Sequence, residues 1–325
     1  MKAHVVITSI FHPTSAVRRF SEIKDMRVVV VGDKKSPDVY DINNVHFLSC
    51  AAQNDMGSRL SAKLPYNHYC RKMMGYIHAI REGAEIIVDT DDDNIPIDSW
   101  CIDGFSGVYP TIKEDKGFIN IYELYTDVKV WPRGLPLRLI NKKTIEKCDL
   151  HEGAAEVGVW QGLADNEPDV DAIYRLTDGK LIKFKSFGKV VLSYGTLSPF
   201  NSQNTIIRRE LFPLLYLPST VTFRFTDILR GFVAQPIMWA SGFKLGFTDA
   251  NVIQERNKHN LSKDFESEVP MYLHTEKIIE ICCRTVTSGA SVTDNLFNCY
   301  VSLVQASIVG DAELEILETW LKDAT

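Results

Sequence analysis

The stretch Ile86-Ile87-Val88-Asp89-Thr90-Asp91-Asp92-Asp93-Asn94 decides how the rest of the chain is interpreted. An apolar run typical of a buried strand leads directly into four aspartates within five residues. Like charges about 4 Å apart repel each other by roughly 4 kcal/mol at an effective dielectric near 20, so such carboxylates either spread into water or bind a cation. Oxygen ligands of this kind suit Mg²⁺, Mn²⁺ or Ca²⁺ rather than zinc, and Mg²⁺ commonly completes its shell with water and substrate phosphate. The stretch therefore favours a metal and nucleotide site over a solvated acidic turn.

The composition indicates a soluble globular protein of one large unit or two small ones. The chain has 325 residues, of which 45% are hydrophobic and 24% charged, and its net charge of −6 argues against a general nucleic-acid binder. No run approaches the roughly 18 apolar residues of a membrane span, and the first residues do not resemble a signal peptide. We therefore expect a cytoplasmic protein without a membrane span, free or at a membrane surface, or a catalytic region cut from a longer precursor.

The first hundred residues alternate strand and helix signals. A helix is predicted over Tyr66–Arg81, and strands are predicted at His4–Ile10, Met26–Val31, Val45–Leu48 and Glu85–Val88. This alternation is typical of a parallel sheet with helices on its faces. Ligands of such sheets collect beyond the carboxyl ends of the strands. There the sequence has Thr8-Ser9, Gly32 to Pro37 and Asp89 to Asn94.

Three chemistries compete for the aspartate run. An EF-hand loop starting at Asp89 would need Gly and Glu where Asn94 and Trp100 stand. An aspartyl-phosphate phosphatase usually carries its nucleophile on the first strand, whereas this run follows several. A nucleotide-sugar transferase fits better, because it uses Asp-x-Asp to hold a metal against the donor diphosphate. We therefore predict Asp91 and Asp93 as ligands of Mn²⁺ or Mg²⁺, with Asp92 between them at the nucleotide.

Several blocks in a fixed order resemble the STELLO-type glycosyltransferase family. They are Val30 to Pro37, Leu64 to Tyr76, Asp89 to Asn94, and Gln161-Gly162-Leu163 followed by Pro168 to Leu176. The last block is also distantly similar to the plant reversibly glycosylated polypeptides. The resemblance covers roughly residues 4 to 275.

The resemblance implies a GT-A fold, an α/β architecture in which a nucleotide-sugar-binding mixed sheet is flanked by helices. On this basis we expect a glycosyltransferase domain over 1–270, with a nucleotide-binding half at 1–100 and an acceptor half at 101–270. A helical extension would follow at 271–325. The apolar repeat around Leu296, Tyr300 and Leu303 supports helices there.

The GT-A scheme also implies roles for residues in two later segments. Asp227, at a predicted helix start, would be the general base that takes the proton of the acceptor hydroxyl in an inverting reaction. A family Glu-Asp pair is Thr226-Asp227 here, which weakens the assignment. His259 would complete the metal shell, Arg256 would contact phosphate, and Arg230 would contact Asp227 or phosphate.

Further nucleotide contacts are predicted from the topology. They come from the ends of the first two strands and from the basic pair of the predicted helix: Thr8, Ser9, Asp33, Lys34, Arg71 and Lys72. Asp169 and Asp171, in the block shared with the family, would meet donor-sugar hydroxyls.

The leading hypothesis is a metal-dependent glycosyltransferase that moves a sugar from a UDP- or GDP-linked donor to a hydroxyl of a glycan or other acceptor. The alternative is a catalytically silent protein that binds nucleotide or supports other glycan-synthesising enzymes. A sugar mutase like the reversibly glycosylated polypeptides is a third reading, but nothing in residues 161–175 certifies the autoglycosylation it needs.

Overall fold

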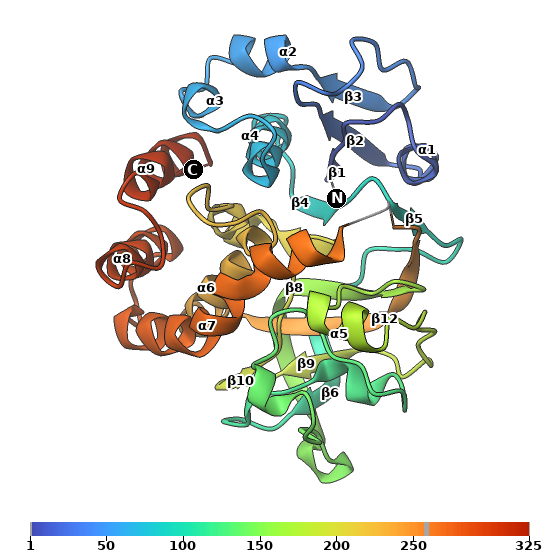
Figure 1. The fold of residues 1–325 in the computed structure, drawn as a ribbon, viewed down its shortest axis with the longest axis vertical. Helices are drawn as coiled ribbons and strands as arrows, with labels where there is room; N and C mark the ends of the chain where they lie inside the picture. Colours follow the sequence, from blue (N-terminus) through green and yellow to red (C-terminus); the bar gives the residue numbers. More distant parts are fainter. Residues whose placement is uncertain (1, 257–259, 325) are drawn as a thin grey trace.

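The computed structural model describes residues 2–256 and 260–324, and a ten-stranded mixed sheet runs through its centre (Figure 1). The strands follow the order β3-β2-β1-β4-β11-β8-β6-β9-β12-β5, with β8 also pairing with β12. Their bounds are β1 Ala3–Thr8, β2 Met26–Val31, β3 Val45–Leu48, β4 Ile86–Thr90, β5 Asn94–Pro96, β6 Ser106–Ile112, β8 Leu150–Asp165, β9 Val190–Leu192, β11 Asn204–Arg208 and β12 Lys244–Gln254. A small second sheet pairs β7 Gly117–Phe118 with β10 Thr196–Leu197.

Helices cover both faces of the sheet. The α-helices are α1 Ser15–Ser21, α2 Cys50–Asp55, α3 Leu60–Lys63, α4 Met73–Arg81, α5 Ala172–Thr177, α6 Thr226–Ala240, α7 Leu261–Thr285, α8 Val292–Gln305 and α9 Glu313–Ala324. The 3₁₀-helices are η1 Tyr69–Lys72, η2 Ile121–Leu124, η3 Leu137–Leu139, η4 Lys147–Asp149 and η5 Arg209–Leu215. The predicted mixed α/β fold with a helical C-terminal part is confirmed, and it is consistent with a GT-A-like architecture.

The strands β1, β2, β3 and β4 form the parallel part of the sheet, as the sequence predicts. Their β-branched side chains are buried because helices cover both faces. Helix α4 lies close against this part of the sheet through Gly75. A Cβ added there would stand 2.5 Å from Val31 Cγ2 and 2.6 Å from Val6 Cγ1, so the close approach requires glycine.

The predicted helix over Tyr66–Arg81 begins three residues late. Asn67 has a positive φ of 53°, and the His68 side chain accepts a hydrogen bond from the Cys70 amide at the start of η1. The left-handed residue and this cap therefore set where the helical segment begins, and η1 continues directly into α4.

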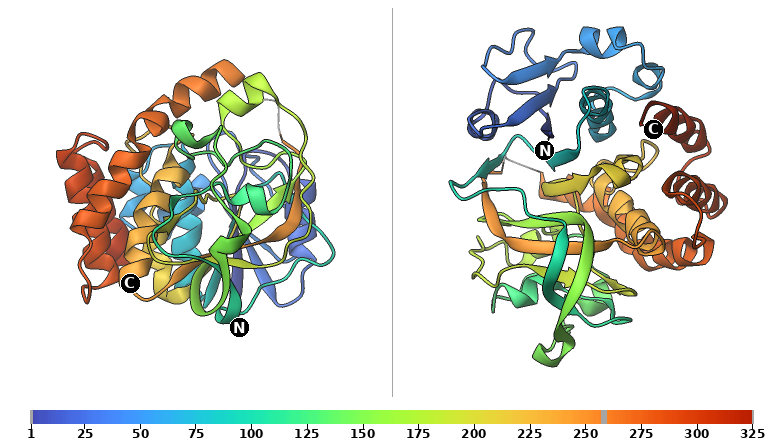
Figure 2. Two further views of the ribbon diagram at one scale, coloured as in Figure 1. Left: turned by 90° about the horizontal axis from the view of Figure 1, so that it is seen from below. Right: turned by 180° about the vertical axis from the view of Figure 1, so that it is seen from behind.

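The sheet changes direction next to β4. β11 pairs antiparallel with both β4 and β8, while β12 runs parallel to β8 (Figure 2). β12 also pairs with β5, which begins at Asn94 directly after the aspartate run. The aspartates therefore lie where the parallel part of the sheet meets the mixed part.

The C-terminal helices fold back onto the N-terminal half (Figure 1). α9 packs against α3 and α4, where Trp320 meets Tyr76 edge-on at 6.4 Å between ring centroids and Ser58 donates to Asp323 at 2.5 Å. A division between residues 270 and 271 would fall within α7, so the placement of that boundary stays a prediction. In the part of the chain that the structure describes, no helix combines the length and apolar character needed to cross a membrane.

Candidate functional site

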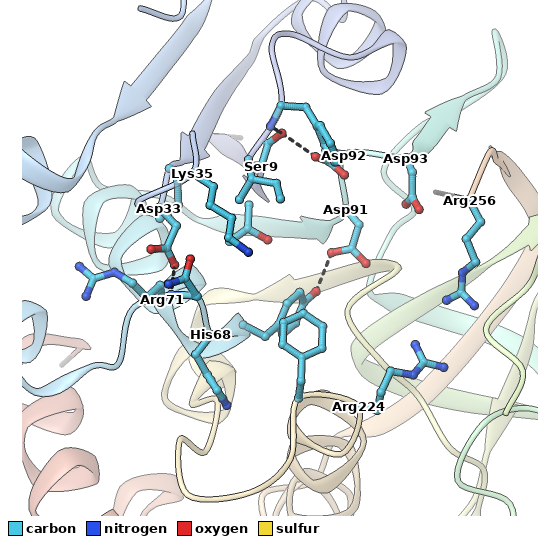
Figure 3. A pocket seen from close by; sticks show the side chains of 18 of the residues that line it. Ser9, Asp33, Lys35, His68, Arg71, Asp91, Asp92, Asp93, Arg224 and Arg256 are labelled. Carbon is cyan, nitrogen blue, oxygen red and sulfur yellow. Dashed lines mark hydrogen bonds between the residues drawn. The ribbon is translucent and has the colours of Figure 1, made fainter. Parts of the chain in front are cut away.

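A cavity of about 360 Å³ opens at the carboxyl ends of β1, β2 and β4 (Figure 3). Eight of the predicted site residues line it: Thr8, Ser9, Asp33, Arg71, Asp91, Asp92, Asp93 and Arg256. Six others lie elsewhere: Lys34, Lys72, Asp169, Asp171, Asp227 and Arg230. His259, the predicted third metal ligand, lies outside the described residues. The strand ends therefore form a cavity of ligand size, as the topology predicts.

Asp91 presents one carboxylate oxygen to the protein and the other to the cavity. Its Oδ1 accepts hydrogen bonds from the Tyr69 hydroxyl at 2.6 Å and from Lys72 Nζ at 3.1 Å. No hydrogen bond to its Oδ2 is found among the described residues. Burial raises the pKa of Asp91, although Lys72 and Tyr69 oppose that effect. The carboxylate is thus held in one orientation, with an oxygen left for a ligand.

Lys72 is fully buried behind the aspartates rather than free to reach a phosphate. Its Nζ lies 2.7 Å from Asp89 Oδ1 and donates to the Thr90 carbonyl at 2.6 Å. Burial disfavours its charge, but Asp89 and Asp91 outweigh that effect and raise the pKa of Lys72. The predicted nucleotide contact by Lys72 is replaced by an internal role, because these carboxylates satisfy its charge.

Asp89 links the aspartate run to helix α6. It is fully buried, and its Oδ2 accepts a hydrogen bond from Arg230 Nη1 at 2.6 Å. Burial acts against its ionisation, but Lys72 and Arg230 hold the pKa of Asp89 below its ordinary value. Arg230 therefore pairs with Asp89 instead of Asp227 or a phosphate.

Asp92 and Asp93 lack a cationic partner among the described residues. Asp92 Oδ2 accepts from the Ser9 hydroxyl at 2.5 Å, and Asp93 accepts from the side-chain amides of Asn94 and Gln254 at 3.2 and 3.1 Å. Burial raises the pKa of Asp92 to about 7 and that of Asp93 to about 6. These carboxylates would gain most from a bound cation.

The donor set fits a divalent metal that keeps few protein ligands. Within residues 2–256 and 260–324, no three His, Cys, Asp or Glu side chains gather into a complete metal cage. The free oxygen of Asp91 and the Asp93 carboxylate nevertheless offer two hard oxygen donors beside the cavity. Mg²⁺ typically binds through one or two carboxylates and fills its other positions with water and substrate phosphate.

The opposite end of the cavity is built from the ends of β1 and β2. Asp33 accepts hydrogen bonds from the backbone amides of Asn67 and Lys34, each at 2.7 Å, and Ser36 Oγ donates to the Ser9 carbonyl at 2.6 Å. The Lys34 side chain turns away to lie 4.4 Å from the centroid of the Tyr66 ring. These contacts order the loop, so Asp33 stays at the cavity while Lys34 does not.

Arg71 lines the cavity, but its guanidinium is engaged by the protein. It donates twice to Gln53 Oε1, at 2.9 and 2.6 Å, and to the carbonyls of Ser61 and Leu64 at 3.2 and 3.1 Å. Arg71 and Lys72, both predicted as nucleotide contacts, are thus buried side chains that bind internal acceptors. The sequence could not show this, because Gln53 and Ser61 belong to separate segments.

Asp227 begins α6 as predicted but is held in a buried ion-pair network. Arg133 donates to its two oxygens at 3.1 and 2.8 Å, and the same guanidinium donates to Asp169 at 2.7 to 3.1 Å. Asn201 Nδ2 adds a bond to Asp169 at 2.7 Å. Both oxygens of Asp227 are thus occupied away from the cavity, and the geometry gives no support to its predicted role as base.

Asp171 is a helix cap. Its side chain accepts from the Tyr174 amide at 2.8 Å at the start of α5 and from Trp131 Nε1 at 2.7 Å. Asp169 and Asp171 are both buried by these partners, and neither lines the cavity. The fold therefore does not bring Asp169 or Asp171 to the cavity, where the predicted contacts with donor-sugar hydroxyls would be made.

Several cavity residues were missed by sequence reasoning. Tyr69 lies within the predicted helix over Tyr66–Arg81 and had no predicted site role. The others lie in loops or at strand ends: Ile10, Phe11, Lys35, Asn67, His68, Phe223, Arg224 and Gln254. Asn67, directly before the Tyr69 segment, offered a signal, since asparagine favours the left-handed turn it makes here. Arg224 offered no such signal, because only the fold brings this cation, just before α6, to the cavity.

Two comparisons with known proteins place the chain. A family model described as STELLO glycosyltransferases matches residues 224–325. The chain is 24% identical to the probable glycosyltransferase STELLO2 and 25% identical to the probable glycosyltransferase STELLO1, both from Arabidopsis thaliana. Each alignment covers 98% of this chain and 44% of the relative, so the chain spans less than half of the length of these proteins. The resemblance predicted from the sequence blocks is confirmed: this chain is similar to the STELLO glycosyltransferases over most of its length.

Proposed function

We propose that this chain is the catalytic region of a glycosyltransferase that takes its sugar from a nucleoside diphosphate sugar. The observation that carries the proposal is the position of Asp91 and Asp93 at the end of β4, beside a cavity of about 360 Å³. The relatedness to STELLO proteins, whose names describe probable glycosyltransferases, supports the same activity. The reaction breaks the bond between the anomeric carbon and the distal phosphate oxygen and forms a bond from that carbon to the acceptor oxygen. The nucleoside diphosphate leaves with the bonding electrons, and the acceptor hydroxyl gives up its proton.

In this proposal the two ends of the cavity bind different parts of the donor. The loop ends at Ser9 and Asp33 would receive the nucleoside, and Asp91 and Asp93 would lie beneath the diphosphate. Mg²⁺ or Mn²⁺ held by these two carboxylates would neutralise charge on the leaving diphosphate. Tyr69 and Lys72 hold Asp91 in place through its inner oxygen. This arrangement orients the outer oxygen before any ligand arrives, which reduces the entropy lost on binding.

The proposal does not extend to an inverting mechanism with Asp227 as base. A general base must reach the proton it removes, but Arg133 donates to both oxygens of Asp227, and Asp227 does not line the cavity. We assign Asp227 instead to the buried ion-pair network that it forms with Arg133 and Asp169.

Calorimetric titration of donor sugars tests the proposal. Wild type, Asp91→Asn and Asp93→Asn are titrated with UDP- and GDP-linked sugars, in Mn²⁺ and in EDTA. We expect one donor class to bind wild type in Mn²⁺ and to lose affinity by about tenfold or more in EDTA or in either variant. Asp98→Asn is the matched control, since Asp98 is 96% exposed and does not line the cavity.

Turnover separates the enzyme from a silent nucleotide-binding protein. Release of free sugar from the bound donor, or its transfer to a glycan acceptor, is expected for wild type and not for Asp91→Asn. Failure of wild type to bind any donor in Mn²⁺ would refute the proposal. Binding without any release or transfer would favour the scaffold alternative.

A further inference from the structure

The arginines that line the cavity differ in whether their side-chain N–H groups have hydrogen-bond acceptors. Arg71 donates to Gln53 and to two backbone carbonyls, and Arg224 donates through Nε and Nη2 to Glu268 Oε1 at 2.9 and 2.7 Å. Arg256 Nε and Nη1 are buried, yet neither atom has an acceptor among the described residues. Of the described cavity-lining cations, Arg256 is the one with buried donors left unsatisfied.

Arg256 also lies among like charges. Burial, together with Arg175 and Arg224, lowers the pKa of Arg256 to about 9, and the carboxylates of Asp169 and Asp93 oppose this only in part. Arg224 has Glu268 as its partner, and Arg175 Nη1 lies 3.7 Å from Glu167 Oε1. The Arg256 backbone amide donates to Glu167 Oε2 at 3.2 Å, and among the described residues Glu167 makes no hydrogen bond with the Arg256 guanidinium. A buried guanidinium without an acceptor is unfavourable, and a ligand that supplies oxygens would remove that cost.

The backbone fixes Arg256 next to the aspartate run. The Glu255 amide donates to the Asp93 carbonyl at 3.0 Å, and the Gln254 side chain donates to the Asp93 carboxylate at 3.1 Å. Figure 3 shows Arg224 and Arg256 on the Asp93 side of the cavity, with Asp33 and Arg71 on the other side. A ligand lying across Asp91 and Asp93 would therefore meet Arg256 at its end remote from Asp33.

We propose that Arg256, beside Arg224, binds an anionic group of the donor. This group lies beyond the phosphate that is attached to the nucleoside. The proposal rests on the function proposed above. Two donor groups have the required chemistry, the distal phosphate of the nucleoside diphosphate and the carboxylate of an acidic sugar. A guanidinium can donate two parallel hydrogen bonds to either group.

Titration with small anions and matched nucleotides tests this proposal. Wild type, Arg256→Gln, Arg256→Lys and Arg209→Gln are titrated in Mn²⁺ with inorganic pyrophosphate, UMP, UDP, UDP-glucose and UDP-glucuronic acid. Arg209→Gln is the control, because Arg209 is exposed and lies outside the cavity. We expect Arg256→Gln to weaken pyrophosphate binding by about 10- to 100-fold, with Arg256→Lys in between and Arg209→Gln unchanged.

The nucleotide arms identify the source of the oxyanion. If the distal phosphate is bound, Arg256→Gln removes most of the advantage of UDP over UMP. If a sugar carboxylate is bound, the variant removes a preference for UDP-glucuronic acid over UDP-glucose instead. Unchanged pyrophosphate affinity together with both preferences retained would overturn the proposal. Loss of pyrophosphate binding in Arg256→Gln, with no nucleotide bound by wild type, would keep the anion site and refute the donor assignment.

Thermal unfolding without ligand gives an independent readout. If Arg256 is an unsatisfied cation, Arg256→Gln should unfold at the same temperature as wild type or higher. Burial and repulsion from Arg175 and Arg224 outweigh the attraction of Asp169 and Asp93, so removing the charge relieves a net cost. Pyrophosphate should then stabilise wild type but not the variant. A clear loss of stability in the ligand-free variant would mean that Arg256 has a structural role, which contradicts the proposal.

Discussion

Lys72→Met is the substitution that most directly tests how the aspartate run is held. Lys72, Asp89, Asp91 and Arg230 form a chain of two positive and two negative charges, joined at 2.6 to 3.1 Å. Lys72 and Asp89 have no exposed side-chain surface, and Arg230 has 2%. Removing one partner of a buried pair typically costs about 3 to 5 kcal/mol, because a buried charge is left uncompensated.

The destabilisation expected for Lys72→Met lies at the lower end of that range. Asp89 keeps Arg230 and Asp91 keeps the Tyr69 hydroxyl, so neither carboxylate loses all its partners. We expect a loss of about 3 kcal/mol in the free energy of unfolding. With an unfolding entropy of about 2.1 cal/mol/K per residue, this corresponds to a fall of roughly 5 °C in the midpoint of thermal unfolding.

Urea and thermal unfolding of a small variant set provide the assay. Lys72→Met/Asp91→Asn leaves Asp89 and Arg230 as a neutral pair, so it should be more stable than Lys72→Met alone. Lys143→Met is the control, since Lys143 pairs with Glu146 at the surface and should unfold as wild type does. A loss below about 1 kcal/mol for Lys72→Met, or a further loss in the double variant, would refute the reasoning.

Three more predictions concern the scaffold. His4 is buried, and burial together with Arg27 lowers its pKa to about 4, so the unfolded chain takes up a proton below about pH 6.5 while the folded chain does not. The free energy of unfolding measured in urea should therefore fall as the pH is lowered from 6.5 to 4, by up to about 3 kcal/mol, and fall less in His4→Leu; equal falls in both would contradict this. Gly75→Ala should lower the free energy of unfolding in urea by about 1 to 2 kcal/mol, because its Cβ would overlap Val31. A gain in stability would contradict this and show that the sheet can move to make room for the methyl group. Glu313→Gln should lower the unfolding free energy by about 3 kcal/mol, since this buried carboxylate accepts bonds from Tyr216 and from the 219–220 backbone; an unchanged urea midpoint would rule that out.

The sequence predicted the parts of the fold that depend on local pattern. The strands β1 to β4 follow from apolar runs, and their parallel arrangement agrees with the helices between β1 and β2 and between β3 and β4. The cavity at their carboxyl ends follows from the same order, because parallel strands end at one edge. Thr8, Ser9, Asp33 and the three aspartates from Asp91 to Asp93 line the cavity for that reason.

The sequence could not predict which charged side chains face inward to each other. Lys72 and Arg230 meet Asp89 from segments 17 and 141 residues away, and Arg133 meets Asp227 across 94 residues. In each case the side chain carries a charge that could bind a ligand. Only its partner in the folded protein shows that it forms an internal ion pair instead. The packing of α9 against α3 and α4 has the same origin, since the apolar stripe of a helix does not identify the surface that it covers.

A structure of the chain with Mn²⁺ and the best-binding nucleoside diphosphate would show directly whether the cavity is a donor site. We expect anomalous density for Mn²⁺ beside Asp91 and Asp93, with the nucleoside at the Ser9 and Asp33 end of the cavity. We also expect the distal phosphate toward Arg256. Density for the metal away from Asp91 and Asp93, or a nucleotide bound outside this cavity, would contradict the proposed function.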